Sequence, residues 1–130
     1  MINANGTFDV KVAPLPLSYD GGDANAGRFS LTKQFHGDLD AASNGEMLTA
    51  GDPKSGSAGY VTVERVSGTL GGRRGAFALQ HSGTMDGGAQ SLSVTVVPGS
   101  GSGELAGISG AMKIIIEGGK HSYEFEYALP

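Results

Sequence analysis

The segment from Tyr60 to Gly110 constrains the fold more than any other part of the chain. It contains three apolar runs in which hydrophobic residues alternate with polar or small ones, and glycine-rich turns separate these runs. Alternation with a period of two is typical of β-strands, and glycines between such runs are typical of tight turns. The segment therefore predicts a meandering antiparallel sheet.

The same pattern extends over the rest of the 130 residues. We expect about eight strands, within Thr7–Ala13, Arg28–His36, Gly37–Ala50, Ala58–Val66, Gly75–His81, Gln90–Val97, Ala111–Glu117 and His121–Leu129. No long helix and no domain boundary is visible, so residues 1–130 are predicted to form a single all-β domain. Eight short antiparallel strands most simply close into a barrel, which removes exposed edges, and a two-sheet sandwich is the alternative.

Three local features refine this expectation. Pro14 and Pro16 are expected to end the first strand, Asp86-Gly87-Gly88 predicts a hairpin, and Ile114-Ile115-Ile116 predicts a strand buried on both faces.

Composition excludes several classes of function. The chain has 9 basic and 13 acidic residues and a net charge of −4, and its largest basic patch is the pair Arg73-Arg74, so we expect no nucleic-acid partner. The absence of cysteine rules out disulfides and thiol chemistry and fits the cytoplasm. Residues 1–13 lack the features of a signal peptide, and no apolar run approaches the roughly 18 residues of a membrane span.

Two long motifs allow a family resemblance to be stated. They are YVTVERVSGTLGGRRGAFALQHSGT at residues 60–84 and VVPGSGSGELAGISG at residues 96–110, and Phe35 to Leu39 and Tyr123 to Tyr127 add to them. With these motifs the chain resembles a family of small bacterial proteins catalogued as a domain of unknown function. The resemblance implies a closed antiparallel barrel similar to allene oxide cyclase, related to lipocalin-like and dirigent-like barrels, with an internal pocket and frequent assembly into dimers or trimers. It implies no activity, and no catalytic residue of the cyclase is carried over.

Glu64 is the first candidate catalytic residue. It lies in the middle of an apolar strand, and if it faces the barrel interior, we expect desolvation to raise its pKa towards that of a useful base. The alternative is a structural cross-strand pair with Arg73, Arg74 or Lys33, the last of which interrupts an otherwise apolar strand face.

His81 is the second candidate, because a histidine can donate or accept a proton near neutral pH. Its neighbour Gln80 lies on the opposite face, so only one of the two can point into the barrel. The alternative reading of His81 is a polar residue at the rim of the barrel.

Four further residues are predicted to bind a ligand together with Gln80. Arg73 follows two glycines and could hold an anionic group at a barrel mouth, although such residues more often lie in solvated turns. Tyr60, Tyr127 and Phe77 could form the wall of a pocket, although aromatic strand residues are more often part of the core.

We expect no metal and no cofactor. The three histidines, His36, His81 and His121, lack the spacing of metal ligands. The Gly101-x-Gly103-x-x-Ala106 pattern is formally similar to a dinucleotide-binding turn, but the following segment is too short for the helix that phosphate binding requires.

The sequence therefore favours a small-molecule pocket in a barrel, with isomerase, cyclase or lyase chemistry as an extension. The ligand would be mostly apolar with one polar end. The alternatives are a carrier without turnover and a structural or assembly subunit whose interior is filled by its own side chains. Internal volume distinguishes these, because eight-stranded barrels are often just wide enough for side chains to fill.

Overall fold

The computed structural model describes residues 1–130 as a closed antiparallel barrel of eight strands, which confirms the predicted fold class. The barrel strands are β1 (Ile2–Leu15), β2 (Gly27–Gly37), β3 (Leu39–Asp52), β4 (Ser57–Leu70), β5 (Arg73–Asp86), β6 (Ala89–Val96), β8 (Ser109–Glu117) and β9 (Lys120–Ala128). A two-residue strand, β7 (Ser102–Gly103), pairs with the start of β5. The only helical segments are the short 3-10 turns η1 (Gly22–Ala24) and η2 (Pro53–Ser55), and none is long enough to cross a membrane.

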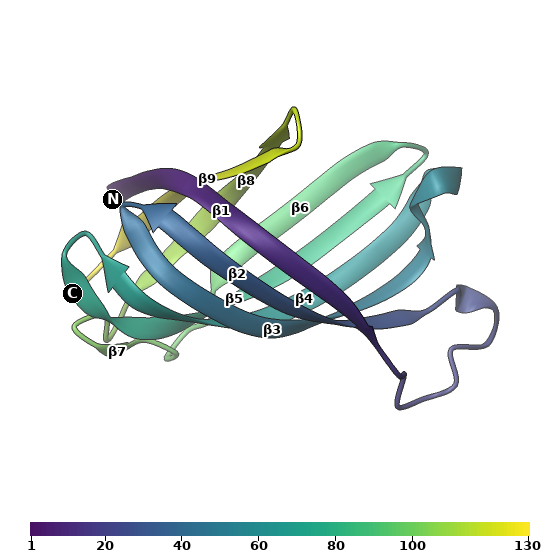
Figure 1. Cartoon of the computed structure of the whole chain (residues 1–130), viewed down its shortest axis with the longest axis horizontal. Coiled ribbons are helices and arrows are strands. Elements are labelled where there is room, and N and C mark those ends of the chain that lie inside the picture. Colours follow the sequence, from purple (N-terminus) through teal and green to yellow (C-terminus); the bar gives the residue numbers. More distant parts are fainter.

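The strands follow one another around the barrel in the order β4-β3-β2-β1-β9-β8-β6-β5, and β5 pairs with β4 to close the circle. The first and last strands meet where Ile2 to Thr7 pair with Tyr127 to Ser122. Figure 1 shows both termini and β7 at one end of the barrel, with the β1–β2 loop and the β3–β4 connection at the other.

Three hairpins turn on paired glycines. The pairs Gly71-Gly72, Gly87-Gly88 and Gly118-Gly119 all have positive φ values, between 56° and 85°. A type I′ turn requires positive φ at both central residues, and its twist matches that of the flanking strands. Paired glycines therefore fix the β4–β5, β5–β6 and β8–β9 hairpins, the second of which the sequence predicts.

Two local expectations were wrong. β1 continues through Pro14, which pairs with Phe29, and ends at Leu15, so the expectation holds for Pro16 but not for Pro14. Beyond Thr7 β1 pairs with β2 alone, and proline is tolerated in such an edge. The run Ile114–Ile116 is not buried on both faces: Ile114 and Ile115 are half-buried and Ile116 is exposed, because this part of β8 pairs with β9 but not with β6.

The two ends of the barrel differ in packing. Near the termini the interior is filled by a core of large side chains, including Phe35, Leu39, Leu70, Phe77, Phe125 and Tyr127. We call this the closed end. At the other end, where β1 meets β2 and β3 meets β4, interior positions carry many small residues and the core is absent. We call this the open end.

Candidate functional site

All the buried polar side chains gather on the interior of four neighbouring strands. They are Lys33 on β2, Ser43 on β3, Thr62 and Glu64 on β4, and His81 on β5. The strand register places Lys33 opposite Ser43 and Thr62 opposite His81. We call these five residues the polar cluster.

Lys33 and Glu64 form the buried ion pair of this cluster. Their Nζ and Oε2 atoms are 3.0 Å apart, although the two residues belong to strands separated by β3. They meet over the small residues Ser43 and Gly45 of β3. A Cβ at Gly45 would lie only 2.8 Å from the Cβ of Glu64, so glycine provides the room for this contact.

His81 lies beside the ion pair. Its Nε2 lies 2.9 Å from Oε2 of Glu64, but the ring N–H is not aligned for a hydrogen bond. A carboxylate beside Nε2 nevertheless favours the proton on that nitrogen, which leaves Nδ1 as a hydrogen-bond acceptor in the neutral ring. Nε2 is a fully buried polar atom without a hydrogen-bond partner, and Nδ1 does not belong to that group.

The structure confirms that Glu64 faces the interior but reverses the expected direction of its pKa. Burial alone would raise the pKa of Glu64, yet the close contacts with His81 and Lys33 outweigh burial and lower it. Glu64 is therefore a carboxylate at neutral pH that holds two cationic or polarised partners, rather than a strong base.

Three further groups of the cluster are fully buried without a hydrogen-bond partner in the protein. They are the Oε1 atom of Glu64 and the hydroxyls of Ser43 and Thr62. Buried polar atoms are nearly always hydrogen-bonded, so these groups offer one acceptor and two hydroxyls for further contacts.

The open end contains a cavity of about 630 Å³. Its lining includes the interior residues Phe29 of β2, Met47 of β3, Tyr60 of β4, Met85 of β5 and Leu92 of β6. No charged side chain lines it. A smaller hollow, of about 440 Å³, lies outside the barrel beside Tyr19, Arg28 and Glu46.

Tyr60 connects the cavity to the polar cluster. It lines the cavity, while its ring centroid lies 6.4 Å from that of His81. Burial, and after it the charge of Glu64, raises the pKa of Tyr60, so the hydroxyl stays protonated. The ring covers Gly83, where a Cβ would come within 2.5 Å of Cε1. The ring of Tyr60 therefore fills the space that a side chain at position 83 would occupy.

The structure brings three of the predicted site residues together and leaves four apart. Glu64, His81 and Tyr60 meet as described. Gln80 is exposed on the outside of β5, which decides between it and His81, and Arg73 is exposed at the β4–β5 turn of the closed end. Phe77 and Tyr127 each stack against Phe125 within the closed-end core, with ring centroids 5.7 Å and 5.3 Å from that of Phe125, and neither lines the cavity.

Sequence reasoning missed the roles of Ser43, Gly45 and Thr62. The available signal was Lys33 itself, since a cation on an apolar strand face requires an interior partner.

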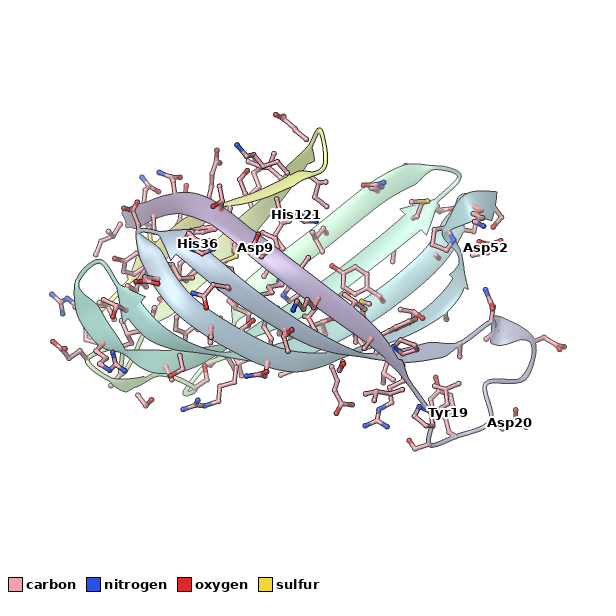
Figure 2. The ribbon with its side chains drawn as sticks, in the orientation of Figure 1. Asp9, Tyr19, Asp20, His36, Asp52 and His121 are labelled. Carbon is pink, nitrogen blue, oxygen red and sulfur yellow. The ribbon has the colours of Figure 1, made fainter.

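The other two histidines lie outside the polar cluster, as Figure 2 shows: His36 pairs with Asp9 on the outside, and His121 packs against Phe8. No group of three or more His, Cys, Asp or Glu side chains is arranged to hold a metal ion.

The fold and the site define a class of protein: a small antiparallel barrel, filled at one end and hollow at the other, with a buried Lys–Glu–His cluster at the boundary. Residues 4–127 match the model of the family described as "Protein of unknown function (DUF3224)", and the chain belongs to that family.

A solved structure supports this assignment. The chain is similar to a protein with unknown function from the DUF3224 family of Shewanella oneidensis MR-1, with 48% sequence identity and a TM-score of 0.93. The match covers 100% of this chain and 98% of the other. No curated protein matches the chain.

Proposed function

We propose that the protein binds an uncharged, mostly apolar small molecule in the open end of the barrel, with one polar group of the ligand directed at His81. The observation that carries this proposal is the cavity of about 630 Å³ separated from a buried Lys–Glu–His cluster by a single aromatic residue, Tyr60. Volumes of this order are typical of small-molecule sites, which combine apolar walls with a few polar groups.

The lining of the cavity supports an uncharged ligand body. Phe29, Met47 and Met85 offer aromatic and thioether surface, and methionine adapts to ligands of different shape. A charged group placed against these walls would lose its hydration without gaining an ion pair. The exposed position of Arg73 at the opposite end removes the anion clamp that the sequence suggested.

The cluster supports a hydroxyl as the polar end of the ligand. With the proton placed on Nε2, beside the carboxylate of Glu64, Nδ1 of His81 can accept a hydrogen bond, and the hydroxyl of Tyr60 supplies a donor or a second acceptor nearby. The positive charge of Lys33 balances that of the Glu64 carboxylate and so stabilises the ionised carboxylate inside the barrel. In this arrangement Glu64 orients His81, and His81 contacts the ligand.

Isomerase, cyclase or lyase chemistry is the proposed extension of binding. A histidine beside a carboxylate, as His81 lies beside Glu64, is the kind of group that moves a proton, and no cofactor is needed for such reactions. A carrier without turnover is the second candidate. The filled closed end favours a structural role for that half alone.

Ligand-induced stabilisation tests the proposal. We expect octanol to raise the melting temperature and to displace an apolar fluorescent dye, and methyl octyl ether, which lacks the donor, to do so less. Octanoate and octylamine should bind more weakly than octanol, because the cavity offers no partner for their charges. His81→Leu should reduce the octanol effect to that of the ether.

The matched control is Gln80→Leu, the same substitution one residue away on the outside of β5. It should leave all four ligands unchanged. The proposal fails if none of the four stabilises the wild-type protein, or if the two leucine variants weaken octanol equally. Exchange of the protons next to the carbonyl of 2-octanone, an uncharged apolar probe, is followed in deuterated water and then separates an enzyme from a carrier. Homo-oligomeric assembly as a dimer or trimer, and a cytoplasmic location, stay predictions.

A further inference from the structure

The barrel wall has one seam at which its strands scarcely pair. β6 and β8 are joined only where Thr95 pairs with Ala111, whereas every other neighbouring pair of the eight strands is joined over six or more positions. Beyond this point β6 runs on towards the open end while β8 stays paired with β9 alone. Figure 1 shows the β8–β9 hairpin diverging from β6.

Residues from both strands of the seam line the cavity. Gln90, Ser91 and Leu92 of β6 and Ile116 of β8 all belong to its lining. The cavity is therefore bounded at this place by two strands that no ladder of hydrogen bonds holds together.

The interior apolar faces of both strands become exposed along the seam. On β6 the exposed fraction rises from 2% at Val94 to 45% at Leu92, and on β8 it rises from 5% at Met112 to 63% at Ile116. These side chains continue the rows that form the core at the closed end. They are apolar side chains of the barrel interior that no other apolar group covers, so removing their surface from water would lower the free energy.

We infer that the ligand is a linear apolar chain, such as an alkyl or isoprenyl alcohol, that extends from the cavity through the β6–β8 seam and covers Leu92 and Ile116. This inference rests on the proposed function, because it assigns the shape of the same ligand. Paired strands lie about 4.8 Å apart, so strands that diverge from one pairing position leave a narrow wedge, which fits a single hydrocarbon chain better than a fused ring system. The absence of charge in the lining matches such a chain.

Chain-length dependence tests the inference. Straight-chain primary alcohols from hexanol to hexadecanol are titrated against the wild-type protein in a dye-displacement assay. A chain that leaves through the seam keeps gaining contact with Leu92 and Ile116, so affinity should rise about fourfold per methylene while the chain covers the seam. A ligand confined to the cavity should show affinity that stops rising once the cavity is full.

Ile116→Glu provides the variant, since a carboxylate on this exposed side chain is tolerated by the fold but opposes an alkyl chain. We expect at least a tenfold loss of affinity for the long alcohols and a smaller loss for hexanol, so that the gain in affinity with chain length is reduced. Val63→Glu is the control, because Val63 has a similar exposed fraction of 58% on the outside of β4.

The outcomes separate this inference from the proposed function. If short alcohols bind but affinity stops rising with length, the seam inference is wrong and the cavity stands. If no alcohol binds, both are wrong. If Ile116→Glu instead dissociates an oligomer and leaves the length dependence unchanged, the seam is an interface between copies of the chain and the inference is overturned.

Discussion

The closed and open ends of this barrel are built from the same strands yet have opposite interiors. At the closed end, Phe77 and Tyr127 stack against Phe125 within the buried core. At the open end, glycine, alanine and methionine occupy many of the positions around Phe29 and Tyr60. Strand number sets the width of a barrel, so side-chain volume decides whether a given layer is filled or hollow. The same eight strands can therefore serve stability at one end and binding at the other.

The polar cluster lies at the boundary between these two regions. Lys33 has its Nζ atom 4.9 Å from the ring centroid of Phe8 and 5.6 Å from that of Phe35, on the side of the core. His81 faces Tyr60 on the side of the cavity. The cluster is thus anchored in the rigid half and presented to the hollow half, which is the arrangement expected of a preorganised site.

The largest difference between the ends should appear on truncation of their side chains. Phe77→Ala removes a fully buried ring, and we expect a loss of about 3–5 kcal/mol in the free energy of unfolding. Met47→Ala, at the half-exposed wall of the cavity, should cost about 1 kcal/mol because less apolar surface is buried there. Urea denaturation measures both. Equal losses would contradict the division into a filled and a hollow end.

The boundary itself is tested by breaking its ion pair. Glu64→Leu leaves Lys33 buried without a counter-charge, which typically costs about 3–5 kcal/mol. The double variant Lys33→Met/Glu64→Leu removes both charges and should recover most of that loss. If the double variant is as unstable as the single one, the charges do not act as a pair, and the cost comes from packing.

Acid titration should reveal the same pair without mutation. The folded-state pKa of Glu64 lies below its usual value of 4.5, so the unfolded chain binds a proton more readily than the folded one. The contribution of Glu64 to stability is then complete above about pH 4.5 and is lost as the pH falls through the folded pKa. Thermal melts across this range should show a steeper acid limb for wild type than for Lys33→Met/Glu64→Leu. If the stability of wild type and of the double variant falls equally steeply with decreasing pH, the acid sensitivity comes from other carboxylates.

A smaller effect is expected at Gly83, which sharpens the description of the open end. Gly83→Ala places a methyl group against Tyr60 and displaces its ring, at a cost of about 1 kcal/mol, the low end for overpacking. Binding of octanol should change more than stability does, because Tyr60 lies between the cavity and His81. Gly59→Ala is the control, since its added Cβ would have no neighbour closer than 3.6 Å. An unchanged octanol affinity in Gly83→Ala would remove Tyr60 from the site.

The smallest effect should come from the predicted residues that the structure leaves outside. Arg73→Ala and Gln80→Ala alter exposed side chains, so each should change the free energy of unfolding by less than about 0.5 kcal/mol. Neither should alter ligand binding by thermal shift. A loss of binding in either variant would mean that the ligand occupies another place than the open end.

The sequence predicts the fold well because its signals are local. Alternation marks the strands, and paired glycines such as Gly87-Gly88 mark the turns, so strand identity and the barrel follow from short windows. The inward direction of Glu64 does not follow from such a window, because Glu64 alternates with the apolar Val61 and Val63, which the structure leaves exposed. Similarly, the contact between Lys33 and Glu64 spans three strands and depends on the absence of a side chain at Gly45. No short window of the sequence contains that information.

The direction of the Glu64 pKa failed for the same reason. Burial can be guessed from a strand pattern, but the sign of the shift depends on which charges the fold brings within a few ångströms. Likewise, the positions of Phe77 and Tyr127 at the filled end, and of Arg73 at the wrong end for binding, depend on the direction of each strand along the barrel axis. Strand identity alone does not specify it.

The pairing of β1 with β9 has a consequence for how the barrel folds. Ile2 to Thr7 pair with Tyr127 to Ser122, which are far away in the sequence. Contacts between residues so distant in sequence form slowly, because the intervening chain must first be brought together. Hairpins between consecutive strands are therefore expected to form first, and the β1–β9 pairing that closes the barrel is expected to form last.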